Sequence, residues 1–174
     1  MGLHRHNTDW EFDDYQWDLR RRLFWATYVL DRTVCFNLGR PLTLSDEQID
    51  AGLPSSDVPQ SPDREPSIAL AIHHIHLRRI QARIITEVYT PGRLKVLTNE
   101  AQRLQILVGI QDDLDQWREQ LNAVYSPELT PHSFQWYERL YHTTTAALHR
   151  ATPLFPRPSE NSIRRCYEAS KTAI

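Results

Sequence analysis

The sequence predicts an all-α fold, an irregular bundle of helices around one central buried helix at about residues 15–38, with no sheet. Apolar residues recur at three- and four-residue steps over several long stretches, which is the period of a helix. No alternating run indicates a strand, and five glycines are few for a β protein. The 174 residues are 40% hydrophobic and include five tryptophans, so we expect a single packed domain spanning residues 1–174.

The helix expected at about 15–38 has the strongest pattern. Its apolar residues occupy one face and continue onto the others: Leu19, Leu23, Ala26, Leu30, Val34 and Leu38, then Phe24, Trp25, Tyr28, Val29, Cys35 and Phe36. A helix that is apolar almost all round is normally surrounded by other helices, so we expect this one to form the centre of the bundle. Gly39 followed by Pro41 is the usual order for a helix stop.

Three further elements are expected in the middle of the chain. Residues 45–48 have the serine and glutamine spacing of a capping box, which predicts a short helical turn to about Asp50. The segment 52–66 contains four prolines and three serines, which is typical of an internal loop. A second long helix is expected at about 67–89. It is apolar on two sides and therefore packed between neighbours, and residues 90–92, Thr-Pro-Gly, end it.

Three more helices complete the expected bundle. One runs from about 99 to 124, and another from Pro131 to about 151, with Thr130 as its N-cap. Ser159 is suited to cap a last helix. No stop signal precedes Ile174, so we expect the chain to be part of a longer protein and the domain to be partial.

Composition excludes several classes of function. The net charge of −2 gives no electrostatic basis for binding nucleic acid. Two distant cysteines, Cys35 and Cys166, do not suggest a disulfide framework, so a reducing intracellular compartment is expected. No apolar run is long enough to cross a bilayer, and no membrane partner is expected.

Two groups of charged residues stand on the expected central helix. Arg20, Arg21 and Arg22 are consistent with a nuclear localisation or phosphate-binding patch. We favour a solvated helix start with one arginine turned inward to a carboxylate. Asp31 and Arg32 are expected to pair inside the bundle, because an unpaired buried charge is strongly destabilising.

Histidines and aspartates on the later helices raise the question of a metal site. His73 and His76 are one helical turn apart, but His74 points elsewhere and no third ligand is near, so we favour a surface pair. The aspartates at 112, 113 and 115 are similar to magnesium-binding acidic helices, although no second acidic stretch accompanies them. We predict a solvated face there. No catalytic or metal-binding residue is predicted, and the sequence indicates no specific ligand-binding residue.

The stretch 19–50 has a more specific pattern. It contains a basic patch, Phe-Trp, an aromatic residue, Leu-Asp-Arg, a Gly-Arg-Pro turn and an acidic Ile-Asp. This order resembles the signature of the fungal-specific transcription factor domain, the middle homology region of zinc binuclear cluster regulators of the xylanolytic-activator type. The signature positions, which we expect to be structural, are Arg20, Arg21, Arg22, Phe24, Trp25, Tyr28, Asp31, Arg32, Gly39, Arg40, Pro41, Asp46 and Asp50.

The resemblance implies an all-helical regulatory domain of a nuclear factor that controls RNA polymerase II transcription. Such factors bind DNA through a separate module with six cysteines and two zinc ions. Two cysteines cannot hold two zinc ions tetrahedrally, so that module is absent from this chain and no cofactor is expected in it. The expected partners are DNA through the separate module only, a homodimer or co-regulators, and a small-molecule effector.

Two alternatives to this function remain open from the residues alone. One is a helical module that binds a small molecule and acts by itself, because the many aromatic side chains are able to line a pocket. The other is a magnesium-dependent helical enzyme that uses Asp112, Asp113 and Asp115, which we rank lower because no convergent catalytic set accompanies them.

Overall fold

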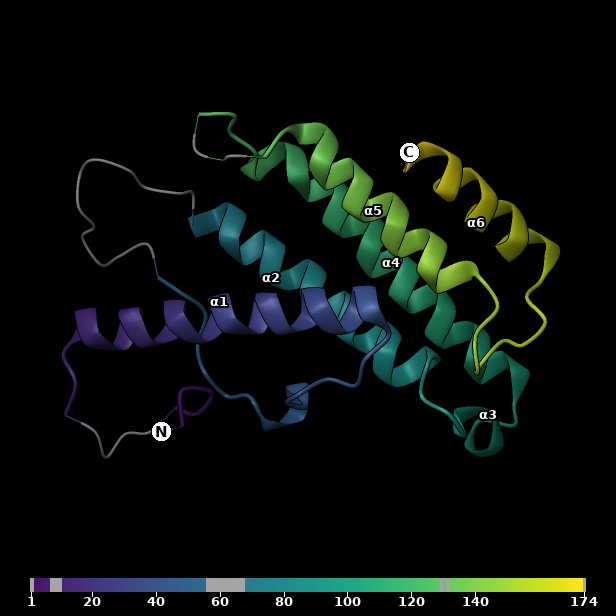
Figure 1. The fold of residues 1–174 in the computed structure, drawn as a ribbon, viewed down its shortest axis with the longest axis horizontal. Helices are drawn as coiled ribbons and strands as arrows, with labels where there is room; N and C mark the ends of the chain where they lie inside the picture. The colour runs from purple at the N-terminus through teal and green to yellow at the C-terminus, as the bar shows by residue number, and fades with distance from the viewer. Residues whose placement is uncertain (1, 7–10, 56–67, 129, 131, 174) are drawn as a thin grey trace.

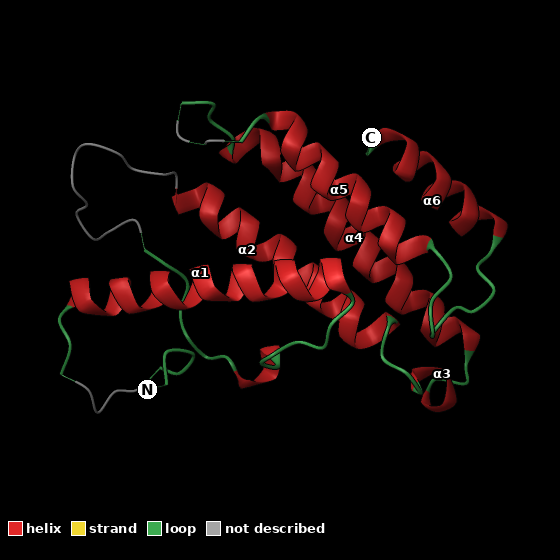
Figure 2. Cartoon of the chain, viewed as in Figure 1, coloured by secondary structure: helices red, strands yellow, loops and turns green. Residues whose placement is uncertain are grey.

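The computed structural model describes residues 2–6, 11–55, 68–128, 130 and 132–173. Within these ranges the chain is all-α and contains no strand, which confirms the predicted fold class (Figure 2). The α-helices are α1 Asp14–Leu38, α2 Ile68–Arg83, α3 Arg93–Val96, α4 Glu100–Val124, α5 Phe134–His149 and α6 Glu160–Thr172. A 3₁₀ turn, η1, spans Asp46–Gln48, and a π-helix, η2, continues α2 over Ile84–Val88.

The long helices pack in the order of the chain (Figure 1). α1 contacts α2, α2 contacts α4, α4 contacts α5, and α5 contacts α6. α1 and α6 therefore form the two outer layers, and α2 and α4 lie inside. The short helix α3 lies at one end of the bundle, within the connection from η2 to α4.

Two clusters of buried side chains hold these layers together. The larger one joins α2, α4 and α5, and its most enclosed members include Leu77, Ile110 and Leu114. The smaller one lies between α1 and α2 and consists of Phe24, Trp25, Tyr28 and Ile75. Each fully buried large apolar side chain contributes about 1.5–3 kcal/mol, so the larger cluster dominates the stability of the fold.

The placement of the helix at 15–38 as the buried centre is wrong, although the helix itself is present. One face of α1 lies against α2 and the segment 39–55, and the opposite face is exposed. Leu30 is 65% exposed, and the same face carries Leu19, Leu23, Val34 and Leu38. Periodicity reports that a helix is apolar on several faces, but it does not say which of them a neighbouring helix covers. The interior positions belong to α2 and α4.

Several expected boundaries also need correction. Ser45 makes no side-chain capping bond to η1, so the capping box expected at residues 45–48 is wrong. The helix expected to start at Pro131 begins at Phe134, because Ser133 supplies the N-cap by accepting from the Trp136 amide. In contrast, Ser159 caps α6 as expected by accepting from the Ser162 amide.

The remaining expectations on local structure have mixed outcomes. The helix expected at 67–89 is present as α2 and η2, and no periodicity signalled its π-helical end. α3 was not expected. Of the loop expected at 52–66, residues 52–55 are irregular, and residues 56–66 lie outside the described part of the chain. Within the described ranges, no helix combines the length and apolarity that crossing a bilayer requires.

Candidate functional site

α1 begins with a capping box that the sequence analysis did not use. The Asp13 side chain accepts from the Gln16 amide at 2.7 Å, and the Gln16 side chain accepts from the Asp13 amide at 3.2 Å. Two of the amides at the helix start are thereby satisfied, and Asp14 adds a negative charge in the first turn. This start fixes where the signature positions fall on the helix.

The three consecutive arginines contact three different parts of the chain. Arg22 bonds the buried carboxylate of Asp18 one turn earlier and donates to the Ser55 carbonyl at 3.2 Å. The Ser55 amide in turn donates to Asp18 at 2.9 Å. Arg20 lies over the Phe12 ring at 4.9 Å, and Arg21 lies against Gly52. The expected inward-turned arginine is therefore Arg22, whose acid partner lies within the same helix.

The aromatic signature residues join α1 to residues 41–55, the return segment, which runs back beside this helix. Phe24, Trp25 and Tyr28 are buried and contact one another at ring-centroid distances between 5.0 and 6.3 Å. The Trp25 indole N–H donates to the Gly52 carbonyl at 2.8 Å. The Arg79 guanidinium of α2 lies over the indole, 4.8 Å from the ring centroid. Trp25 thus contacts α1, α2 and the loop together.

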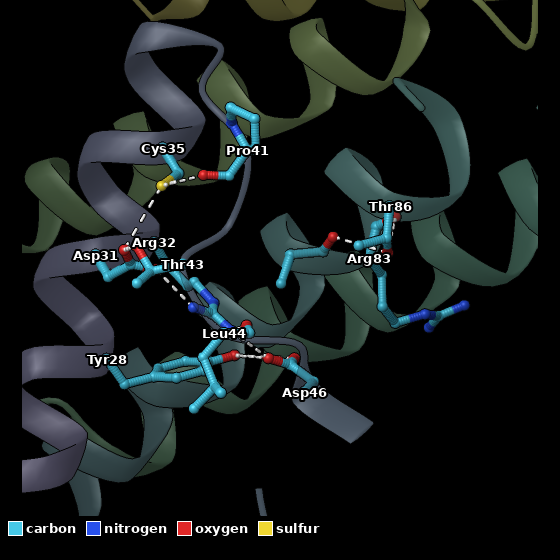
Figure 3. A network of polar contacts seen from close by, with 11 residues as sticks. Tyr28, Asp31, Arg32, Cys35, Pro41, Thr43, Leu44, Asp46, Arg83 and Thr86 are labelled. Atoms are coloured by element: carbon cyan, nitrogen blue, oxygen red, sulfur yellow. Dashed lines mark hydrogen bonds and ion pairs between the residues drawn. The ribbon is translucent and has the colours of Figure 1, made fainter. Parts of the chain in front are cut away.

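Arg32 is the centre of the signature network (Figure 3). It is 1% exposed, and its Nη1 donates to Asp31 at 2.6 Å. Its Nη2 donates to Asp46 at 2.6 Å and to the Leu44 carbonyl at 2.5 Å. Burial disfavours the charged guanidinium, but the hydrogen bonds to Asp46 and Asp31 outweigh it, so the pKa of Arg32 is raised. The expected pairing of Asp31 with Arg32 is confirmed.

Tyr28 completes this network from one turn earlier on α1 (Figure 3). Its hydroxyl donates to the Asp46 carboxylate at 3.0 and 3.1 Å, and the Arg32 guanidinium lies 4.2 Å from the centre of its ring. Burial, followed by the negative charge of Asp46, raises the pKa of Tyr28 well above its ordinary value. The phenol therefore stays protonated and acts as a hydrogen-bond donor, not as an acid or a nucleophile.

A second set of bonds fixes the turn after α1. Thr43 donates its hydroxyl to Asp31, and the Cys35 thiol donates to the Pro41 carbonyl at 3.1 Å. Burial, with the nearby Asp31 charge, raises the pKa of the Cys35 thiol, so this cysteine is a poor nucleophile. Gly39 ends α1 in the left-handed region at φ 63°, which a residue with a side chain rarely adopts.

The last acidic signature residue contacts the start of the chain. Asp50 accepts from the His6 amide at 2.7 Å and lies 3.7 Å from the Arg5 guanidinium. The amides of Asp50 and Ala51 both donate to the His4 carbonyl. The segment at the N-terminal end of the chain is thereby attached to the return loop. Arg40 is exposed and lies outside this network.

The arrangement is a polar clamp of Tyr28, Asp31, Arg32 and Asp46 between α1 and the segment 41–46. Its one cation lies between two carboxylates, and all three groups are held by hydrogen bonds. It offers neither a general base beside a nucleophile nor a converging set of metal ligands. Its chemical role is to hold the return segment on α1.

The histidines do not form the expected surface pair. His73 is buried and stacks on Trp117 at a centroid distance of 4.6 Å, and the Trp117 indole donates to the His73 carbonyl. Burial lowers the pKa of His73 to about 4. The physical reason for the error is that α2 is covered by α4 on the side of His73, so a helical position that the sequence allows at a surface lies in the interior.

The acidic residues at 112, 113 and 115 do not converge. Asp112 is exposed, Asp113 pairs with Arg83 of α2, and Asp115 accepts from Gln111 and Tyr141. Across the described ranges, no group of three or more acidic, histidine or cysteine side chains is arranged to hold a metal ion. The solvated face that we expected is thus partly a set of pairings between helices.

Sequence reasoning missed several residues that build the site. Asp18 and Arg22 are four positions apart, a spacing typical of a helical ion pair, and this signal was available. The roles of Thr43 and of the Leu44 and Gly52 carbonyls had no signal, because they depend on how the return segment lies along α1. A buried pair between α4 and α5, Gln111 with His149 at 2.9 Å, had none either.

A family model described as the fungal specific transcription factor domain matches residues 1–119, which include the whole signature network. The chain belongs to this family. Four of the residues that carried the resemblance, Tyr28, Asp31, Arg32 and Asp46, form the clamp. Others, such as Arg22, Trp25 and Asp50, make separate contacts outside it.

Three relatives illustrate the family. Pyrimidine pathway regulatory protein 1 of Saccharomyces cerevisiae is 28% identical over 100% of this chain and 21% of its own length. An uncharacterized transcriptional regulatory protein of Schizosaccharomyces pombe is 35% identical over 78% of this chain and 16% of its own length. Protein STB5 of Saccharomyces cerevisiae is 26% identical over 84% of this chain and 22% of its own length.

The chain is thus related to proteins that are named as regulators. The chain spans about a fifth of the length of the curated relatives that it matches. No solved structure matches it.

Proposed function

We propose that this chain is the regulatory domain of a fungal zinc-cluster transcription factor and that it modulates RNA polymerase II transcription without catalysing a reaction. The observation that carries the proposal is the family match over residues 1–119, which contain the clamp of Tyr28, Asp31, Arg32 and Asp46. The relatives support it, because one is named as a pathway regulatory protein and another as a transcriptional regulatory protein.

DNA binding and zinc binding are assigned in this proposal to a separate module of the longer protein. The net charge of −2 argues against direct DNA binding by these residues. Two cysteines, of which Cys35 is held by the Pro41 carbonyl, are too few for two zinc ions. The nucleus is the expected compartment. The other partners in the proposal are a second copy or co-regulators and a small-molecule effector.

The competing enzyme hypothesis has little support. Asp113 and Asp115 are engaged by Arg83 and Tyr141 on different neighbouring helices, so they do not present a shared site for magnesium. Titration with magnesium and a diphosphate tests this hypothesis, because a helical magnesium enzyme requires measurable heat of binding. The second alternative is a ligand-binding module that acts alone. It differs from our proposal only because no DNA-binding module is attached to it.

The proposed function is tested by fusing residues 1–174 to an unrelated DNA-binding module above a reporter gene in yeast. We expect reporter expression to differ from that of the DNA-binding module alone. The matched control is the same fusion with Arg32→Met, which removes the centre of the clamp, and its effect on the reporter should be lost. Unchanged expression with a folded, expressed fusion contradicts the regulatory role.

The presence of a zinc-cluster DNA-binding module in the longer protein is tested separately, by sequencing the gene upstream of the codon for Met1. A six-cysteine cluster followed by a basic linker supports the zinc-cluster assignment. If the complete reading frame contains no such cluster, the DNA-binding part of the proposal is wrong, and the regulatory role then has to act through another DNA-binding protein.

A further inference from the structure

α1 is an outer helix of the bundle (Figure 1), and the face opposite to its packed side carries an apolar stripe. Leu23 is 55% exposed and Leu30 is 65% exposed, near the middle of the helix. The whole α1 stripe runs at three- and four-residue steps and consists of Leu19, Leu23, Ala26, Thr27, Leu30, Val34 and Leu38. A monomeric protein rarely exposes apolar side chains along a long helix, so such a stripe marks a surface that meets a partner.

The α1 stripe has nearly the same order of residues in both directions. Its midpoint lies between Ala26 and Thr27, which are two small residues. The exposed positions at equal distances before and after this midpoint are alike in character: Leu23 with Leu30, Leu19 with Val34, Tyr15 with Leu38, and Gln16 with Asn37. Apolar positions therefore correspond to apolar ones, and amides correspond to amides.

A surface with this order is complementary to a second copy of itself. In a twofold symmetric contact, residue i of one copy meets residue j of the other, and j meets i. Two antiparallel copies of α1 that cross at Ala26 and Thr27 bring Leu23 of each copy against Leu30 of the other. Small side chains at the crossing allow an axial distance at the lower end of the usual range of about 8–10 Å. An unrelated partner does not require a stripe that reads alike in both directions.

The two ends of α1 differ in charge, which favours the antiparallel orientation. Glu11, Asp13 and Asp14 are exposed at its N-terminal end, and Arg40 is exposed just after its C-terminal end. Across the described ranges, no ion pair involves Arg40. An antiparallel pair places each Arg40 near the acidic end of the other copy and opposes the two helix dipoles. A parallel pair places like charges side by side.

We propose that two copies of this chain associate through their α1 stripes as an antiparallel, twofold symmetric pair. Each copy covers the exposed leucines of the other, while α2 and the return segment stay on the far side of each α1. A contact between two single helices buries less than about 1,200 Å² in total, which is typical of a weak, reversible interface. We therefore expect a dissociation constant of about 10 µM.

This pairing gives the second copy in the proposed function a specific binding surface. A role of the dimer in transcription rests on that proposed function, whereas the association of the chain does not. The two are separable by experiment, because association is measured on the chain alone and regulation is measured with the reporter fusion.

Sedimentation equilibrium of residues 1–174 measures the association. We expect mainly monomer at about 1 µM and mainly dimer at about 100 µM. Leu23→Glu and Leu30→Glu each place a carboxylate of both copies at an apolar contact, so each should weaken the dimer by about tenfold or more. The matched control is Ile163→Glu on α6. Ile163 is 55% exposed, like Leu23, and its substitution should leave the association unchanged.

Disulfide cross-linking tests the orientation. A chain with Leu19→Cys, mixed with a chain with Val34→Cys, should form a cross-linked pair of the two under mild oxidation. Leu19→Cys alone should not, because its two copies lie about 22 Å apart along an antiparallel pair at 1.5 Å per residue. The unaltered chain, which keeps Cys35 and Cys166, gives the background.

The contribution of charge is tested at Arg40. Arg40→Glu should weaken the dimer about fivefold at low salt, because a symmetric pair contains the contact twice. About 0.5 M salt should remove this difference, since it screens exposed charges. An affinity that is unchanged by Arg40→Glu at low salt contradicts the contribution of the helix ends.

Each other outcome contradicts the proposal. A chain that stays monomeric at about 100 µM shows that something other than a second copy covers the stripe. A dimer that survives both glutamate substitutions uses a different surface, and a disulfide in Leu19→Cys alone indicates a parallel pair. If a glutamate variant fails to fold by circular dichroism, the cross-linking decides. A reporter fusion that is inactive although the chain dimerises contradicts only the proposed function.

Discussion

At the scale of single residues, Arg32 determines the geometry of the clamp. It contributes three hydrogen bonds to two acidic side chains and one carbonyl that lie up to fourteen positions away. Lysine cannot reproduce this, because it has a single nitrogen in place of the planar fork that reaches two partners at once. The signature position is therefore specific for arginine on physical grounds.

We expect Arg32→Met to lower the free energy of unfolding by about 3 kcal/mol, because Asp31 and Asp46 lose their buried counter-charge. Arg40→Met removes the same kind of side chain from an exposed position and should change the stability by less than about 0.5 kcal/mol. Urea unfolding followed by tryptophan fluorescence measures both. Equal stabilities of the two variants would show that the clamp is dispensable.

Buried histidines make the stability depend on pH. Burial lowers the pKa of both His73 and His149 to about 4 from an ordinary value near 6.5, so both are neutral in the folded chain and protonated more easily in the unfolded one. The contribution of these two neutral histidines to the free energy of unfolding is fully present above pH 6.5. This contribution is lost as the pH falls toward 4. When the pH is lowered from 7 to 5, each histidine should lower the free energy of unfolding by about 2 kcal/mol.

The variant His73→Phe isolates one of these contributions. It keeps a ring against Trp117 and removes the titration, so the slope of stability against pH between 7 and 5 should become clearly smaller. Melting temperatures measured across this range at constant ionic strength test the prediction. A slope identical to that of the unaltered chain contradicts the assignment to His73.

At the scale of elements, the two faces of α1 have opposite energetic roles. Trp25 is 1% exposed and contacts both α2 and the return segment, whereas Leu30 is exposed on the outer face. We expect Trp25→Ala to cost about 3–5 kcal/mol. Leu30→Ala should change the stability by less than about 0.5 kcal/mol. Denaturant unfolding of the two variants, side by side, distinguishes an outer helix from a central one.

Helix caps offer a second comparison between elements. Ser159 accepts the Ser162 amide at the start of α6, so Ser159→Ala should cost about 1 kcal/mol. Ser45 precedes η1 without a capping bond, and Ser45→Ala should have almost no effect. The difference in unfolding midpoint between the two variants measures the cap. If Ser45→Ala lowers the stability more than Ser159→Ala does, Ser45 acts as the cap that the sequence predicts.

At the scale of the whole molecule, the layers differ in how much they bury. α4 contributes residues such as Ile110, Leu114 and Leu121 that are fully enclosed, whereas α6 contacts α5 and buries mainly Ser162 and Ala169. The fold therefore has a stable interior and a weakly held last layer.

Native-state hydrogen exchange should resolve this difference. The amides of α6 should exchange through a local opening at low denaturant, and those around Leu114 only on global unfolding. Mass spectrometry of exchanged peptides from both helices gives the two rates. Uniform protection of α4 and α6 contradicts the layered picture and indicates a single cooperative unit.

The sequence predicts much of this fold and less of its arrangement. Periodicity and caps are local, so the long helices, the Gly39 turn and the Ser159 cap follow from nearby residues. The position of α1 at the edge does not, because burial depends on which neighbours cover each face. In the site, the sequence predicts the pairing of Asp31 with Arg32. It does not predict the contacts to the Leu44 and Gly52 carbonyls, because these depend on how the return segment lies along α1.

The one-sided packing of α1 has a mechanical consequence. The helix has 25 residues and is about 37 Å long, and contacts from Asp18 to Cys35 hold it on one side only. A rigid rod supported in this way acts as a lever: a tilt of about 5° moves each end by about 1.6 Å in opposite directions. A small displacement between α1 and α2 would therefore reach both the Asp13 end and the Gly39 turn as an amplified movement.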